Sequence, residues 1–171
     1  MKSLLVLLLL AFPVAAQTAD IDRQMWIPFV EGVNTDKPEL YVGIHSPEFH
    51  WVAPGGKGRV MDLAEYDVDS RMVMERRRKN GERAEVEIRF LERNVRAAFA
   101  AEKAIIRFTL FKDGQAQTSY GIAHYFSRKE NGVWKMLVQY GSTEKGTAEM
   151  FAASAPITSL PTTQPSPAPS R

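Results

Sequence analysis

The stretch that decides the fold runs from Gln117 to Gly141 and reads QTSYGIAHYFSRK, then ENG, then VWKMLVQYG. Two β-rich runs flank the dipeptide Asn131-Gly132, and the earlier runs Ala104–Lys112 and Gln115–Arg128 are joined through Asp113-Gly114. Asn-Gly and Asp-Gly between apolar β-rich runs are strong hairpin signals, because these residues accept the positive φ angles of a tight turn. The sequence therefore predicts an antiparallel meander in the C-terminal half.

The segments before the meander read mainly as helices. Apolar residues recur at helical spacing after the acidic start at Asp20, and Asn80-Gly81 is typical of a helix end. We predict helices over Asp20–Val33, Lys37–Val42 and Met61–Lys79, and strands over Glu48–Ala53 and Glu85–Val95. Helices followed by a strand, a helix and a meander indicate the α+β class.

Both ends of the chain differ from the middle. Lys2, the apolar run Leu4–Phe12 and the small residues Val14-Ala15-Ala16 follow the three-part pattern of a signal peptide, so we expect residues 1–16 to be cleaved and the protein to be periplasmic or secreted. The apolar run is shorter than the ~20 residues of a membrane span, so no stable membrane anchor is expected.

The last twenty residues are rich in Pro, Ser, Thr and Ala, and five of them are proline. Residues 152–171 are therefore expected to form a disordered tail. From Ala155 onward the large aliphatic side chains are Ile157 and Leu160, so we expect this part to be dispensable for folding. Residues 17–151 remain as a single domain, of a length that supports one core.

Composition excludes several functions. The formal net charge is +2, and removal of Lys2 with the signal leaves 2 − 1 = +1. The run Arg76-Arg77-Arg78-Lys79 lies at an expected helix end, where cations favour the helix dipole, so nucleic-acid binding is not predicted. The chain has no Cys, which excludes disulfides and thiol catalysis. No cofactor is indicated.

The order of these segments resembles the nuclear transport factor 2-like superfamily, and most closely its SnoaL-like branch, the domain of unknown function 4440. The resemblance covers roughly Asp20 to Thr143. Its most specific part is Thr118-Ser119-Tyr120-Gly121 followed by Arg128-Lys129, Asn131-Gly132, Trp134-Lys135 and Tyr140; Leu40-Tyr41, Ser46-Pro47-Glu48-Phe49 and Gly58-Arg59 add to it. The resemblance implies N-terminal helices packed in a strongly curved antiparallel sheet, a cone-like barrel with a pocket.

Members of this superfamily include isomerases, dehydratases, polyketide cyclases and non-catalytic binding or dimer modules, so the fold does not define one function. Its enzymes typically use an Asp–His or Tyr–Asp pair in the pocket, and this sequence has no unambiguous equivalent of either.

Strand alternation nominates three catalytic candidates. Tyr120, Ile122, His124 and Phe126 share one face of a strand, and Tyr140 shares a face with Trp134 on the next strand, so His124 and Tyr140 could act as acid and base. Glu92 has the parity of the apolar positions around Phe90, where burial would raise its pKa. The alternative is that His124 has no catalytic role and lies in an apolar wall with its hydrogen bonds made within the protein.

Four further residues are expected to line a ligand pocket: Tyr120, Arg107, Trp26 and Phe126. Arg107 and Glu92 also suit cross-strand ion pairs, and Trp26 suits the core. His45, His50 and His124 lack a standard metal-ligand spacing, so no metal site is predicted.

Three functions stay open on the sequence. The first is a module that binds a small, largely apolar molecule. The second is an enzyme of the isomerase, dehydratase or hydrolase kind that uses His124, Tyr140 and Glu92. The third is a homodimeric interaction module. The second requires these three side chains to converge on one cavity within reach of a common atom.

Overall fold

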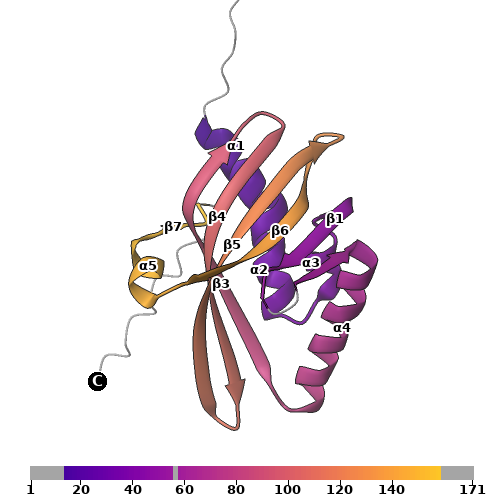
Figure 1. Ribbon diagram of the computed structural model, residues 1–171, viewed down its shortest axis with the longest axis vertical. Coiled ribbons are helices and arrows are strands. Elements are labelled where there is room, and N and C mark those ends of the chain that lie inside the picture. The colour runs from indigo at the N-terminus through magenta and orange to yellow at the C-terminus, as the bar shows by residue number, and fades with distance from the viewer. Residues whose placement is uncertain (1–13, 56–57, 159–171) are drawn as a thin grey trace, which may run out of the picture.

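Seven strands form one curled, unclosed sheet in the computed structural model, which describes residues 14–55 and 58–158 (Figure 1). The strand order is β2-β1-β6-β5-β4-β3-β7. The strands are β1 (His45–Ala53), β2 (Arg59–Asp62), β3 (Arg83–Val95), β4 (Phe99–Lys112), β5 (Gln115–Glu130), β6 (Val133–Lys145) and β7 (Ala155–Pro156). The helical segments are α1 (Val14–Ile21), η1 (Asp22–Trp26), α2 (Ile27–Asn34), α3 (Pro38–Val42), α4 (Leu63–Lys79) and α5 (Ala148–Ala153).

The meander is confirmed, and it extends over four strands. β3, β4, β5 and β6 pair antiparallel in sequence order. Both predicted turns have positive φ at both central residues: 50° and 74° at Asp113 and Gly114, and 51° and 83° at Asn131 and Gly132. This geometry matches the right-handed twist of the flanking strands, which explains why these dipeptides fix the hairpins.

The prediction of a wholly antiparallel sheet is wrong at one junction. β1 pairs parallel with β6, so the sheet is mixed. β1 follows α3 in the chain and forms an antiparallel hairpin with β2. Its partner β6 is distant in the sequence, so no hairpin requires these two strands to be antiparallel. The predicted helix over Met61–Lys79 begins two residues later, at Leu63, because Met61 belongs to β2, where it pairs with Trp51 and is buried in the core.

The N-terminal helix is longer than predicted. Helical backbone runs from Val14 to Asn34, and the turn from Asp22 to Trp26 is π-helical. Pro28 lies two residues after this turn and lacks the N–H that a regular α-helix would use, so the wider turn lies where the hydrogen-bond ladder is interrupted. Val14 also lies inside the predicted signal segment, whose residues 1–13 are outside the described part of the chain.

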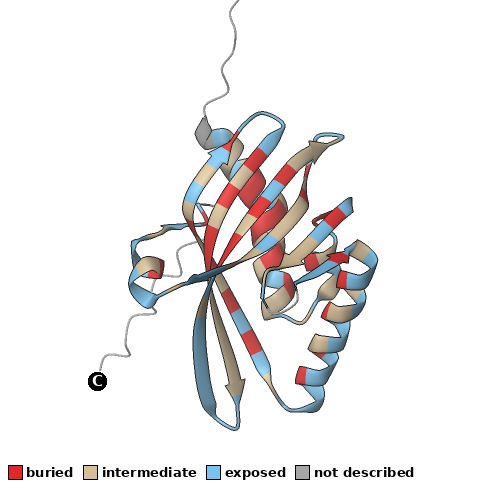
Figure 2. Ribbon diagram, in the orientation of Figure 1, coloured by how far each residue is buried: buried red, intermediate tan, exposed pale blue. Residues whose placement is uncertain are grey.

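The core lies between this helix and one face of the sheet, here called the inner face. Trp26 is fully buried and makes edge contacts with Phe90 of β3 and Tyr125 of β5, at ring-centroid distances of 5.3 and 4.8 Å. Figure 2 shows buried residues along the helix and along the strands that it crosses. On the opposite outer face, Phe151 of α5 packs with Ile105 and Ile122 in a second, smaller cluster.

The chain beyond Ala152 is ordered as far as Thr158, so the expected disordered tail does not begin at Ala152. β7 pairs with β3, and the side chain of Ile157 is buried. Thr158 donates hydrogen bonds from its backbone N and its Oγ1 to Oδ2 of Asp22, at 3.0 and 2.6 Å. Ordering only residues 155–158 is enough to bury Ile157, and this costs much less conformational entropy than ordering the whole segment from Ala155 onward. Residues 159–171 lie outside the described part of the chain.

Candidate functional site

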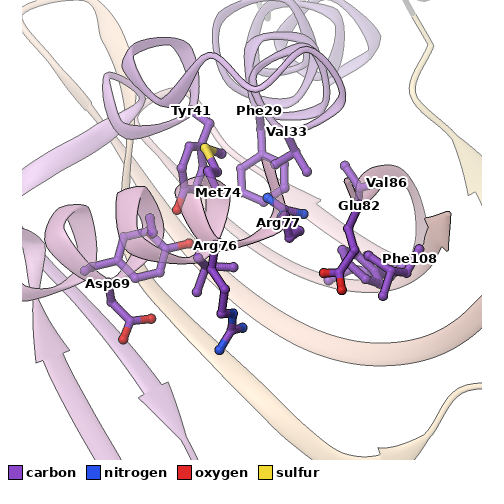
Figure 3. Close-up of a pocket in the computed structure, with 15 residues that line it drawn as sticks. Phe29, Val33, Tyr41, Asp69, Met74, Arg76, Arg77, Glu82, Val86 and Phe108 are labelled. Carbon is purple, nitrogen blue, oxygen red and sulfur yellow. The ribbon is translucent and has the colours of Figure 1, made fainter. Parts of the chain in front are cut away.

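A cavity of about 450 Å³ opens between the helices and the inner face of the sheet (Figure 3). Its volume falls within the range of small-molecule sites in proteins, which is roughly 300–1,000 Å³. The apolar part of the lining is Phe29, Val33, Val73, Met74, Val86, Ile106, Phe108 and Leu110. The polar part is Tyr41, Tyr66, Asp69, Ser70, Arg76, Arg77 and Glu82.

One face of α4 supplies much of this lining. Tyr66, Ser70, Met74 and Arg77 are the buried residues of the helix, and their spacing of four, four and three residues places them on one side. α4 begins with a capping box in which Asp62 bonds the backbone N–H of Glu65 and the Glu65 side chain bonds the backbone of Asp62. This cap fixes where the helix starts, and hence which side chains face the cavity.

Two phenols lie in the cavity wall. Burial raises the pKa of Tyr41, and burial raises the pKa of Tyr66 well above its usual value, so both remain neutral. The hydroxyl of Tyr66 donates to Oε1 of Gln139 at 3.4 Å, and Tyr41 interacts with Ser70. The polar part of the wall therefore offers neutral hydroxyl groups at neutral pH.

His45 lies behind these phenols in an aromatic cluster. Its ring centroid is 4.1 Å from that of Phe49, 5.2 Å from Tyr66 and 6.1 Å from Tyr41. Burial lowers the pKa of His45 to about 4, although a hydrogen bond between Nδ1 and the carbonyl oxygen of Val42, at 3.1 Å, favours the charged form. His45 is therefore neutral at neutral pH, with Nδ1–H as the donor.

Arg77 is the buried cation of the cavity wall, and only 9% of its side chain is exposed, whereas Arg76 of the same wall is exposed. Its Nη2 lies 3.9 Å from Oδ1 of Asp36, which is well beyond the ~2.7–2.9 Å of a charge-assisted hydrogen bond. Its Nε is buried without a hydrogen-bond partner among the described residues. Figure 3 shows Arg77 among the side chains of Phe29, Val33 and Met74.

A second polar cluster is closed on itself. Arg93 donates from Nη1 and Nη2 to the two carboxylate oxygens of Asp22, at 3.1 and 2.6 Å, and from Nε to Oε1 of Glu102 at 2.7 Å. Nε1 of Trp26 donates to Oε2 of Glu102 at 3.1 Å. Burial raises the pKa of Glu102, while Arg93 acts in the opposite direction. Because each charge has partners, this cluster connects the helix to the sheet and leaves little capacity for a ligand.

The three predicted catalytic residues form one row across the outer face instead of converging on this cavity. The strand register pairs Glu92 with Lys103, Lys103 with His124, and His124 with Tyr140. The row spans three strand spacings, about 14 Å in all, so Glu92 and Tyr140 cannot reach a common atom. Only His124 and Tyr140 are neighbours, with ring centroids 6.0 Å apart.

Two β-bulges explain why strand parity failed. In the β3–β4 pair the register shifts between Phe90 and Glu92, so Glu92 leaves the buried face and is exposed, while Arg93 takes the inward position. In the β5–β6 pair Phe126 lies opposite Val138 and Ser127 lies opposite Met136, so the register shifts at this point. An extra residue inverts the alternation beyond it, which places Tyr140 on the face opposite Trp134.

The predicted ligand-lining residues also lie outside the cavity. Trp26 belongs to the core. Tyr120 and Arg107 contact Phe151 of α5 on the outer face, where Arg107 also pairs with Glu87. Phe126 is 39% exposed beside Phe99. Glu92, His124 and Phe126 do line a smaller depression of about 290 Å³ between β3, β4 and β5, but Tyr140 is not part of its lining.

Sequence reasoning missed the α4 face. Tyr66, Ser70 and Arg77 recur at helical spacing, which is the signal that could have found them. The basic run at the end of α4 contains Arg77, but the same helical spacing places Arg77 on the buried face. Within residues 14–55 and 58–158, no group of three or more His, Asp or Glu side chains is placed to hold a metal ion. None of the helices in this part is long and apolar enough to span a membrane.

Comparison with solved structures defines the class of fold. A nuclear transport factor 2-like superfamily protein from Salmonella enterica aligns with a TM-score of 0.60 and 16% identity, over 79% of this chain and 97% of its own. A nuclear transport factor 2-like protein with a cystatin-like fold from Novosphingobium aromaticivorans aligns with a TM-score of 0.61 and 9% identity, over 81% and 89% of the two chains.

A third structure, from Catenulispora acidiphila in complex with S-DNPA, aligns with a TM-score of 0.59 and 10% identity, over 74% and 94%. No protein-family model and no curated protein matches the chain. The resemblance predicted from the sequence is therefore confirmed for the fold: the chain has the nuclear transport factor 2-like fold.

Proposed function

We propose that the protein binds a small, largely apolar molecule in the cavity between α2, α4 and the inner face of β3 and β4. The observation that carries this proposal is the lining itself. Eight of the fifteen residues that line the cavity of about 450 Å³ are apolar, and the other seven are polar. Ligand sites are typically lined by apolar side chains together with polar groups that orient the ligand. The complex of a similarly folded protein with S-DNPA is consistent with ligand binding by this fold.

A neutral fluorescent probe tests the proposal without involving charge. The uncharged compound N-phenyl-1-naphthylamine is added to the purified protein, and its emission is recorded. We expect saturable enhancement that is lost in Val73→Trp, because Val73 lines the cavity and the larger side chain fills it. Val68→Trp is the matched control on the same helix, since Val68 is 59% exposed and does not line this cavity. Equal binding by both variants, or none by the parent protein, would reject the proposal.

We prefer binding to catalysis because the side chains of His124, Tyr140 and Glu92 do not converge on one ligand atom.

A homodimeric role is a second proposal, favoured by three exposed aromatic side chains on the outer face: Phe99, Phe126 and Tyr140, at 45, 39 and 38% exposure. Light scattering of the purified protein measures the molar mass directly. A monomer at all accessible concentrations would reject the dimer.

Export to the periplasm or medium stays a proposal that rests on the signal-like segment, residues 1–16. Cleavage before Gln17 would remove Val14, Ala15 and Ala16 from the first turn of α1. Fractionation of cells that express the chain, followed by N-terminal sequencing, tests both location and cleavage site. An intact N-terminus in the cytoplasmic fraction would contradict the proposal.

A further inference from the structure

The cavity wall contains a buried cation whose hydrogen-bonding capacity is largely unused. A guanidinium group has five N–H donors and carries its charge at every accessible pH. Arg77 is about nine-tenths buried, and its Nε has no acceptor among the described residues. The ion pair with Asp36 is loose at 3.9 Å. Such a group is costly to bury unless an acceptor satisfies it.

The acidic residues of the same wall are engaged elsewhere. Asp69 accepts from Nη1 of Arg59 at 3.2 Å, and Glu82 accepts from Nζ of Lys112 at 2.9 Å. Each carboxylate therefore has a cationic partner outside the cavity, which reduces its repulsion of an anion inside. Arg77 thus provides a positive charge that is available to a ligand within the cavity.

We infer that the cavity selects an amphipathic anion: an aromatic or aliphatic body with one carboxylate, whose oxygens bond the guanidinium of Arg77. This inference rests on the proposed function, because it names the ligand class of the same site. The eight apolar side chains hold the body, and Arg77 binds the head group. Arg–carboxylate pairs are among the strongest hydrogen-bonded contacts, and low solvent access strengthens them.

The test compares two ligands of the same shape. 2-Naphthoate and its neutral counterpart 2-naphthamide are titrated by calorimetry into the purified protein. We expect naphthoate to bind at least tenfold more tightly. Arg77→Met should reduce this preference to less than threefold while N-phenyl-1-naphthylamine still binds. Arg78→Met is the matched control, because Arg78 is exposed and does not line the cavity. It should keep the preference.

A second variant keeps the test decisive if Arg77→Met does not fold. Asp36→Asn removes the charge that competes for Arg77, and Asn is well suited to the positive φ of 52° at this position. We expect naphthoate affinity to rise severalfold in Asp36→Asn and naphthamide affinity to stay unchanged. An unchanged or weaker naphthoate affinity in this variant would count against Arg77 as the head-group ligand.

The outcomes separate this inference from the proposed function. If the neutral probe binds and Val73→Trp abolishes its binding, but naphthoate and naphthamide bind equally, the cavity is a ligand site and the role of Arg77 is wrong. If Arg76→Met, at the rim, removes the preference and Arg77→Met does not, the inference is also overturned. If neither the probe nor naphthoate binds, both proposals fail.

Discussion

Nη2 of Arg93 lies 2.6 Å from Oδ1 of Asp22, so a charged pair joins the N-terminal helix to β3 in the interior. The Asp22 side chain is fully buried, and that of Arg93 is 12% exposed. Asp22 also accepts from Thr158, and Arg93 also donates to Glu102. The pair is therefore the junction of three parts of the chain that are far apart in sequence.

Replacement of Arg93 should lower the urea concentration at which half of the protein is unfolded. Arg93→Met leaves the carboxylates of Asp22 and Glu102 buried without their cation, which typically costs about 3–5 kcal/mol. Arg71→Met is the control, because Arg71 is 52% exposed and pairs with Asp67 one helical turn away. That change should cost less than about 0.5 kcal/mol. Urea unfolding measures both, and similar values would show that the buried pair adds little.

The ordered C-terminal segment should contribute to stability. Truncation after Ser154 removes β7, the buried Ile157 and both hydrogen bonds from Thr158 to Asp22. After subtraction of the ordering entropy of four residues, we expect a loss of about 2 kcal/mol and a fall in melting temperature of about 6 °C. Truncation after Thr158 keeps these contacts and should change the melting temperature by less than about 2 °C. Identical melting of the two truncated proteins would show that the segment does not stabilise the domain.

Burial of His45 should make stability depend on pH. Its pKa is about 4 in the folded protein and 6.5 as the reference for the unfolded chain, so the unfolded state binds the proton more readily. The contribution of neutral His45 is present above pH 6.5 and is lost as the pH falls toward 4. Between pH 7.5 and 4.5 the free energy of unfolding should decrease by about 2.5 kcal/mol from this group.

His45→Phe isolates that contribution, because other groups titrate equally in both proteins. Phe preserves the aromatic contacts with Phe49 and Tyr66 but loses the hydrogen bond to Val42. We expect lower stability at pH 7.5 and a shallower decline toward pH 4.5, measured by urea unfolding at each pH. Parallel pH profiles for the two proteins would disprove the assignment.

Tyr125 should be replaceable at no cost. Its hydroxyl is fully buried with no hydrogen-bond partner among the described residues, and burial raises its pKa. Tyr125→Phe removes an unsatisfied polar group and keeps the ring against Trp26. We expect the free energy of unfolding to stay equal or rise by about 1 kcal/mol. Tyr66→Phe is the comparison, since it removes the bond to Gln139 and should destabilise. Destabilisation by Tyr125→Phe would reveal a partner for the hydroxyl.

Local signals predicted the meander because the turns are encoded within two residues. Asp113-Gly114 and Asn131-Gly132 need no distant contact to adopt positive φ. Face assignments failed at Glu92 and Tyr140 because one inserted residue reverses the alternation, and the insertion depends on pairing with a neighbouring strand. The parallel contact of β1 with β6 likewise depends on tertiary packing.

The candidate site was less predictable than the fold. Its lining comes from helices and strands that a linear pattern does not bring together. Arg77 appeared as one cation in a basic run, and only the position of α4 against the sheet distinguishes it from Arg76 and Arg78. Residue spacing can place Arg77 on the face of Tyr66 and Ser70, but it cannot show what that face contacts.

The bond between Thr158 and Asp22 has a consequence for how the chain folds. The bond joins residues that are 136 positions apart in the sequence. The buried carboxylate of Asp22 in the N-terminal helix therefore gains its last hydrogen-bond donor only when Thr158 reaches it. Contacts of such long sequence separation slow folding, because the entropy of loop closure is lost before the contact forms. Ribosomes add about 5–20 residues per second, so the growing chain exists for several seconds before Thr158 is available to bond Asp22. This contact therefore forms only after the chain has been synthesised as far as Thr158, later than the contacts of the same helix with β3.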